Sequence, residues 1–185
     1  LVTMRYTILV PMITARYNHA TAVLDSKLFV MGGFNGSDSL SSVECLDLEQ
    51  GQWLEVAPMI TAWMNHGAAV LGGNIFVAGG ENREGGVGNS VESFDAATNQ
   101  WTAVTPMNTR RWGHGLVSAQ GKLFAVGGYN PQDGFLSSVE CFDPSTRVWS
   151  NIAALRNARS SPAVAVVGDK LYAIGGSSSK GQCVN

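Results

Sequence analysis

Three histidines are the side chains of this 185-residue chain whose type and spacing first suggest chemistry. His19, His66 and His114 recur at intervals of 47 and 48 residues, and imidazole nitrogen is a common ligand of zinc and copper. A metal site needs its donors about 2.0–2.3 Å from one ion. Side chains that recur once in each copy of a repeat form a ring and do not converge. We therefore expect structural histidines and neither a metal nor another cofactor.

The three cysteines offer no metal-binding pattern. Cys45, Cys141 and Cys183 form no Cys-x-x-Cys or comparable spacing. A sparse, odd number of cysteines is typical of a reducing compartment, so we expect a cytoplasmic protein in which these side chains act as small hydrophobic residues. We assign no catalytic residue and expect a protein without enzymatic activity.

These residues belong to a repeat of about 48 residues. The repeated features are the glycine pairs at 32–33, 79–80, 127–128 and 175–176, the tryptophans Trp53, Trp101 and Trp149, the glutamates Glu44, Glu92 and Glu140, and the aspartates Asp47, Asp95 and Asp143. A glycine pair at a strand end lets a ring lie close to the backbone, and we expect the repeated tryptophan to fill that space. We expect the glutamates to accept hydrogen bonds from turn backbone.

Each copy contains four short strand-like segments. In the first copy they cover residues 19–24, 27–31 and 42–48, and the fourth runs from Trp53 to the residue before Pro58. The turn residues between the first two segments, such as Asp25-Ser26, tolerate positive φ and are typical of hairpins. Only 14% of the residues are charged, against a usual value of about 25%, and no segment has helical periodicity. We predict an all-β fold in which each copy forms one four-stranded antiparallel blade of a β-propeller.

The order of these features is specific. In the first copy, the strand Phe29-Val30-Met31-Gly32-Gly33 precedes Val43-Glu44-Cys45-Leu46-Asp47 and then Trp53; the later copies carry Val91-Glu92-Ser93-Phe94-Asp95 with Trp101, and Val139-Glu140-Cys141-Phe142-Asp143 with Trp149. This pattern resembles the kelch repeat and is closest in style to the kelch domain of BTB-kelch proteins. The resemblance implies a kelch-type β-propeller.

The repeat divides residues 1–185 as a single kelch-repeat domain. Full copies cover residues 11–57, 58–105 and 106–153, and residues 154–185 form a truncated copy. Tyr6 stands five residues before Pro11 as Trp53 stands five before Pro58, so residues 1–10 are expected to supply the last strand of a preceding blade. Because propellers have about 4–8 blades, we expect a partial ring or a small ring of about four. Open blade edges would then favour self-association.

Binding residues are expected on loops, where the copies differ. An arginine, or in the second copy a tryptophan, precedes the first strand of each copy, and arginine can bind a carboxylate with two hydrogen bonds. In BTB-kelch proteins such arginines and the residues after them contact ligands; the alternative, pairing with the repeated Glu or Asp inside a blade, is left open. Aromatic and asparagine side chains follow the glycine pairs. The candidate partner-binding residues are Arg16, Tyr17, Phe34, Asn35, Trp63, Asn82, Arg111, Trp112, Tyr129, Asn130, Arg159 and Ser160.

The predicted function is protein–protein interaction, with a protein or peptide ligand on one face of the propeller. The resemblance implies substrate recognition for a cullin-type ubiquitin-ligase adaptor. One alternative is binding to actin or the cytoskeleton; another is a copper enzyme like galactose oxidase, although no tyrosine here has the Cys and His surroundings that such a site needs. A net charge of −2 with twelve scattered basic residues argues against nucleic acid. No apolar run is long enough to span a membrane.

Overall fold

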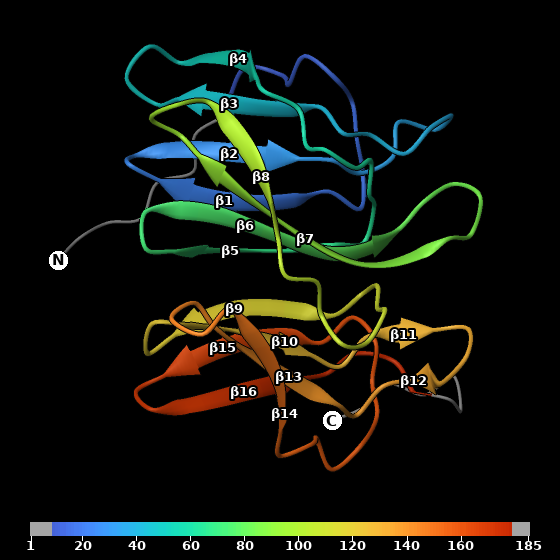
Figure 1. Cartoon of the computed structure of the whole chain (residues 1–185). Helices are drawn as coiled ribbons and strands as arrows, with labels where there is room; N and C mark the ends of the chain where they lie inside the picture. Colours follow the sequence, from blue (N-terminus) through green and yellow to red (C-terminus); the bar gives the residue numbers. More distant parts are fainter. Residues whose placement is uncertain (1–8, 179–185) are drawn as a thin grey trace, which may run out of the picture.

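The computed structural model describes residues 9–178, which fold as successive antiparallel sheets without a helix (Figure 1). The first blade contains β1 (Ala20–Leu24), β2 (Lys27–Met31), β3 (Val43–Asp47) and β4 (Gln52–Val56). The second contains β5 (Gly67–Leu71), β6 (Asn74–Glu81), β7 (Val87–Asp95) and β8 (Gln100–Val104). The third contains β9 (Gly115–Ala119), β10 (Lys122–Val126), β13 (Val139–Asp143) and β14 (Val148–Ile152), and the fourth contains β15 (Ala163–Val167) and β16 (Lys170–Ile174).

This arrangement confirms the predicted all-β fold with four-stranded antiparallel blades. The four blades follow one another without closing a ring, as a partial propeller does (Figure 1). Of the strand expected within residues 1–10, only residues 9 and 10 are described, and they belong to no strand. The end of the truncated copy, with Cys183, lies outside the described residues. The structure also contains a small hairpin that the sequence did not predict, β11 (Tyr129–Asn130) with β12 (Gly134–Phe135), in the loop after the third glycine pair.

Tight turns set the register of the first two strands in each blade. Asp25 and Ser26 have φ values of 49° and 60°, and Gly72 and Gly73 have values of 59° and 81°. Positive φ at both central residues is the geometry of a type I′ hairpin turn, whose twist matches that of the flanking strands. The turn residues that the sequence singled out therefore perform the expected role.

Consecutive blades pack face to face around a common axis. The first strands β1, β5, β9 and β15 lie side by side in that order. Between the first two blades, Phe29 meets Phe94 edge to face, with ring centroids 5.8 Å apart, within one buried apolar cluster. Between the next two, Phe76 and Leu116 join a second cluster. Apolar burial between blades is therefore the main stabilising contribution to this fold.

The repeated tryptophans do not cover the glycine pairs, so that prediction is wrong. Trp101 packs on Phe94 in its own blade with centroids 5.0 Å apart, and its indole Nε1 donates to the carbonyl of Ala57, 2.8 Å away. The space above the glycine pair is taken by the histidine of the next blade: a Cβ on Gly32 would lie 2.7 Å from Cε1 of His66. The tryptophans instead anchor the chain where it enters each blade.

The histidines are thus packing residues. His66 and His114 are buried, and neither nitrogen of either ring has a hydrogen-bond partner among residues 9–178. Burial lowers the pKa of His66 from 6.5 to about 4 and lowers the pKa of His114 well below 6.5, with Arg111 adding to the effect on His114. Both rings are therefore neutral at pH 7, which suits their contact with glycine backbone.

The buried histidines predict acid sensitivity. In the unfolded chain these residues take up protons near pH 6.5, whereas the folded chain resists protonation down to about pH 4 for His66. The free energy of unfolding should therefore be nearly constant between pH 7 and pH 8 and fall by about 1.4 kcal/mol per pH unit for each such histidine as the pH drops below 6.5. Urea denaturation from pH 4.5 to 8 measures this. A His66→Gln variant should show a shallower slope; an unchanged slope would contradict the assignment.

Candidate protein-binding face

Loops gather at one end of the blades, on the right in Figure 1, where β11 and β12 lie. Isolated β-bridges connect each segment that enters a first strand to the loop after the glycine pair of the same blade. These bridges join Tyr17 to Phe34, Met64 to Glu81, Trp112 to Tyr129 and Ser160 to Ser177. We call this surface the loop face; it comprises residues 15–18, 34–40, 62–65, 81–87, 110–113, 129–136, 158–161 and 177.

A chain of backbone hydrogen bonds holds the loop face together from blade to blade. The N–H of Asn65 donates to the carbonyl of Asn18, that of Gly113 to Asn65, and that of Ser161 to Gly113, at 2.6–2.9 Å. All four residues have φ between 52° and 59°. This left-handed conformation suits Gly and Asn, and it turns each peptide group toward the neighbouring blade. The inner margin of the loop face is therefore a rigid frame.

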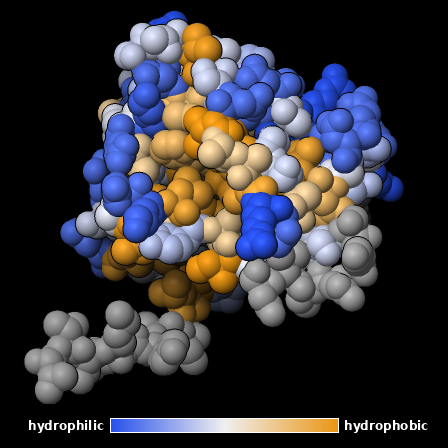
Figure 2. Space-filling view, turned by 90° about the horizontal axis from the view of Figure 1, so that it is seen from below, coloured by the Kyte–Doolittle hydropathy of each residue, from blue (hydrophilic) through white to orange (hydrophobic). Residues whose placement is uncertain are grey.

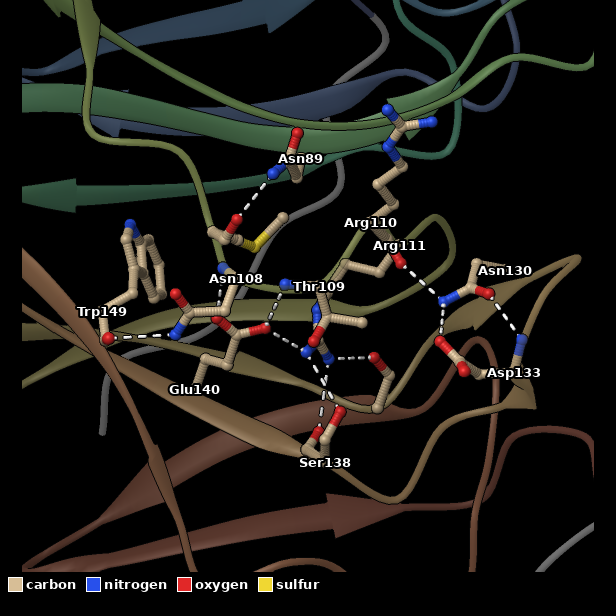
Figure 3. Close-up of polar contacts among 12 residues, drawn as sticks. Asn89, Asn108, Thr109, Arg110, Arg111, Asn130, Asp133, Ser138, Glu140 and Trp149 are labelled. Atoms are coloured by element: carbon tan, nitrogen blue, oxygen red, sulfur yellow. Dashed lines mark hydrogen bonds and ion pairs between the residues drawn. The ribbon is translucent and has the colours of Figure 1, made fainter.

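Below this frame, buried arginines pair with the repeated glutamates. Nη2 of Arg111 lies 2.6 Å from Oε1 of Glu140, and both side chains are fully buried. Nη1 of Arg111 donates to the carbonyls of Gly127 and Ser138, at 2.6 and 3.2 Å (Figure 3). Glu140 also accepts the backbone N–H groups of Asn108 and Thr109. The prediction that the glutamates bind turn backbone is confirmed.

The first blade repeats this network. Arg16 pairs with Glu44 at 2.6 Å and also binds the carbonyls of Gly32 and Ser42. Arg159, in the fourth blade, is 6% exposed and binds the carbonyl of Gly175. The structure therefore favours the structural alternative for all three arginines, because side chains engaged inside a blade cannot reach a partner on its surface.

Trp63 takes the place of the arginine in the second blade, and it too is buried. Its indole Nε1 donates to Oγ of Ser90, and its ring lies against Gly88, where a Cβ would come within 2.4 Å of the ring. Glu92 therefore has no arginine partner and is held by the N–H groups of Ile60 and Thr61. Burial raises the pKa of Glu92.

The candidate asparagines organise their own loops. Oδ1 of Asn35 accepts the N–H groups of Ser37 and Asp38, and Oδ1 of Asn82 accepts that of Gly86. Asn130 is buried, and its Nδ2 donates to the carbonyl of Arg110 at 2.9 Å (Figure 3). Ser160 is also buried. These residues shape the loop face, and among them only Asn35 is exposed.

The aromatic candidates are the ones that the loop face presents. Tyr17 is 55% exposed and packs edge to face on Phe34, with centroids 5.5 Å apart. Trp112 packs on Tyr129 at 5.3 Å, and Tyr129 on Phe135 at 5.2 Å; these three rings are partly exposed. Phe135 was not among the predicted residues, since the hairpin that brings it to Tyr129 was not expected.

Arg110 is the functional candidate that the sequence analysis missed. It is exposed and lines a pocket of about 210 Å³ between the second and third blades, with Gly86, Val87 and Gln132. Its side chain points away from Asn130 toward the second blade (Figure 3). No acidic group pairs with it among residues 9–178. The other three copies carry alanine at this position, at 15, 62 and 158. This difference between the copies could have identified Arg110 from the sequence.

Comparison with known proteins agrees with this architecture. The family model of KLHDC2/KLHL20/DRC7 kelch-repeats domains matches residues 4–176. The chain belongs to this kelch-repeat family. Among solved structures it is similar to YjhT, with 21% sequence identity and a TM-score of 0.80, and the match covers 96% of this chain and 63% of YjhT. No curated protein matches the chain.

The kelch fold confirms the predicted propeller type. Kelch-repeat domains generally bind proteins, and membership of the family therefore suggests a protein-interaction module. In residues 9–178, no three His, Cys, Asp or Glu side chains form a group that could hold a metal ion. The same residues contain no helix long and apolar enough to cross a membrane.

The buried ion pair predicts a large cost for losing one partner. Arg111→Met would leave Glu140 buried without its cation, and we expect the free energy of unfolding to fall by about 3–5 kcal/mol. As a control, Arg83→Met removes the exposed Arg83–Asp38 pair and should cost under about 1 kcal/mol. Chemical denaturation measures both. A similar small loss in the two variants would contradict a structural role for Arg111.

Proposed function

We propose that this kelch domain recognises a partner protein with the loop face. The observation that carries the proposal is the pair of aromatic groups, Tyr17 with Phe34 and Trp112 with Tyr129 and Phe135, which stand partly exposed on a backbone frame. Tyrosine and tryptophan supply much of the binding free energy at protein interfaces, and rigid presentation lowers the entropy lost on binding.

Arg110 indicates the chemistry of the bound segment. Arg83, also exposed on the loop face, is already paired with Asp38 at 2.9 Å. No acidic side chain among residues 9–178 pairs with the guanidinium of Arg110, which can therefore pair with an incoming anion. Guanidinium binds a carboxylate through two parallel hydrogen bonds. The partner segment is therefore one that places a carboxylate beside an apolar side chain.

The finer biological role is substrate recognition for a cullin-type ubiquitin-ligase adaptor in the cytoplasm. The support for this step is the resemblance of the repeats to those of BTB-kelch proteins. Under this proposal, the loop face captures the substrate while other domains contact the ligase. Co-purification of a cullin with the parent protein from cells, together with ubiquitination of the captured partner, would test it; capture without any ligase component would contradict it.

The binding face itself is tested by a matched pair of arginine variants. A partner is identified by crosslinking to the wild-type domain, and its affinity is then measured by calorimetry. Arg110→Ala should weaken binding by about tenfold or more, because a charge-assisted hydrogen bond is lost. Arg147→Ala removes an exposed arginine from the turn between β13 and β14, at the other end of the blade, and should have no effect.

Substituting Trp112 with Ala should weaken binding further, while circular dichroism confirms that the fold is retained. The proposed face is wrong if the Arg110 and Arg147 variants bind equally well.

A further inference from the structure

A groove of about 680 Å³ runs between the second and third blades, outside the loop face. Its volume lies within the range of about 300–1,000 Å³ that is usual for ligand sites. Four consecutive residues, 102–105, line it, and because successive side chains of a strand point to opposite faces, the main chain of β8 itself forms one wall. Among residues 9–178, β8 pairs only with β7, so its outer edge is open to the groove.

The corresponding place between the first two blades is bridged by an asparagine. There Oδ1 of Asn99 accepts the backbone N–H of Ala57, 3.0 Å away, and so ties the second blade to the segment that leaves the first. Arg147 replaces this asparagine in the third blade, and Thr105 stands in the position of Ala57. A guanidinium has no acceptor atom, so the same bridge cannot form between the second and third blades.

The second blade contributes a carboxylate without the cation that the third blade supplies. In the third blade Nζ of Lys122 lies 2.9 Å from Oδ2 of Asp143. Asn74 and Asp95 occupy these positions in the second blade, and the amide of Asn74 carries no charge. Oδ1 of Asp95 accepts two backbone N–H groups of its turn, at 2.8 and 3.3 Å. Its other oxygen can therefore bind an incoming cation from the groove, which Asp95 lines.

Arg147 supplies the opposite charge. It is exposed, lines the groove, and pairs with no acidic side chain among residues 9–178. Asp95 lies opposite Gln100, at the start of β8, whereas Arg147 holds the position from which Asn99 reaches the residue after β4. The negative and positive groups therefore mark the two ends of β8, whose five residues extend over about 17 Å.

The rest of the groove combines polar walls with an apolar base. The walls carry hydroxyl and amide side chains, those of Ser93, Thr98, Gln100, Thr102 and Thr105. Phe76 and Phe142 form the buried base, and Phe76, unlike Phe29 in the first blade, makes no ring contact among residues 9–178. Figure 2, seen from the side of the fourth blade, shows a surface on which hydrophobic residues gather. The groove along β8 is instead suited to a polar chain with one apolar side chain.

From these features we infer that the groove binds an extended segment of another protein, which adds as a strand to the outer edge of β8. Main-chain hydrogen bonds to β8 give affinity, and the side chains give specificity. A basic side chain binds Asp95, an acidic one binds Arg147, and an apolar one between them packs on Phe76. Because alternate side chains of a strand share a face, the pattern is basic-x-apolar-x-acidic. This site is separate from the loop face and does not depend on the function proposed for it.

Synthetic peptides of this pattern test the inference. The probes are fluorescein-labelled peptides with the core Lys-Thr-Phe-Thr-Glu and with the reverse order, because a strand can add to an edge in either direction. One of them should bind the full chain in fluorescence anisotropy and protect the amides of β8 from hydrogen exchange, while β4 and β14 exchange as before. The same peptide with glutamine in place of its lysine and glutamate should bind about tenfold more weakly or worse, because two charge-assisted hydrogen bonds are lost.

Variants of the groove separate the two charges. Asn74→Lys gives Asp95 the lysine that the third blade has, and Arg147→Asn introduces the residue of the second blade; each should weaken peptide binding by about fivefold or more. Asp95→Asn keeps an oxygen for the turn and should have the same effect. The matched control is Asp47→Asn, which changes the equivalent turn of the first blade and should leave binding unchanged.

Several results would overturn the inference. These are the absence of binding by either peptide, equal binding of the charged and glutamine peptides, unchanged affinity in the Asn74→Lys and Asp95→Asn variants, and peptide binding without protection of β8. Loss of binding in the Arg110→Ala variant would also overturn it, because the peptide would then occupy the loop face. The partner of the loop face is measured separately, so that each proposal can fail without the other.

Discussion

The buried carboxylate at the start of each third strand is the interaction on which the rest of this structure depends. Glu44 and Glu140 each accept two backbone N–H groups from the segment that enters the blade, and each also binds an arginine. Burying an ion pair costs much of its Coulomb energy in desolvation, and breaking one by removing a partner costs more. The pair therefore contributes little net stability but strongly specifies one geometry: an entering segment fixed to the third strand of its own blade.

The second blade shows which part of this interaction is essential. Glu92 keeps its two backbone donors although Trp63 replaces the arginine, and its raised pKa reflects burial without a cation. The carboxylate–backbone contact is thus common to the three full blades, whereas the arginine is interchangeable with a large ring that packs on Gly88. The second blade gains apolar burial where the first and third gain charge-assisted hydrogen bonds.

Most of the fold could be predicted from the sequence because its constraints are local or repeated. Turn residues such as Asp25-Ser26 indicate positive φ. The glycine pairs, the glutamates and the strand-like segments all recur with the same spacing. The candidate site could be predicted less well. The sequence around an arginine near a loop does not reveal whether its side chain faces solvent or a buried glutamate. Arg16 and Arg111 were therefore predicted to bind a partner, although both are buried. Likewise, the repeat does not predict the hairpin of β11 and β12, because Asn130 and Asp133 stabilise it through hydrogen bonds within one loop.

Variation between copies carried the information that recurrence could not. Positions 15, 62 and 158 are alanine where the third copy has Arg110, and the loop frame needs no charge there because its hydrogen bonds are made by backbone groups. A charged side chain at this position is therefore not needed for the structure that the four copies share. A departure from the repeat such as this added charge thus separates a surface that can bind from residues that only hold the blades.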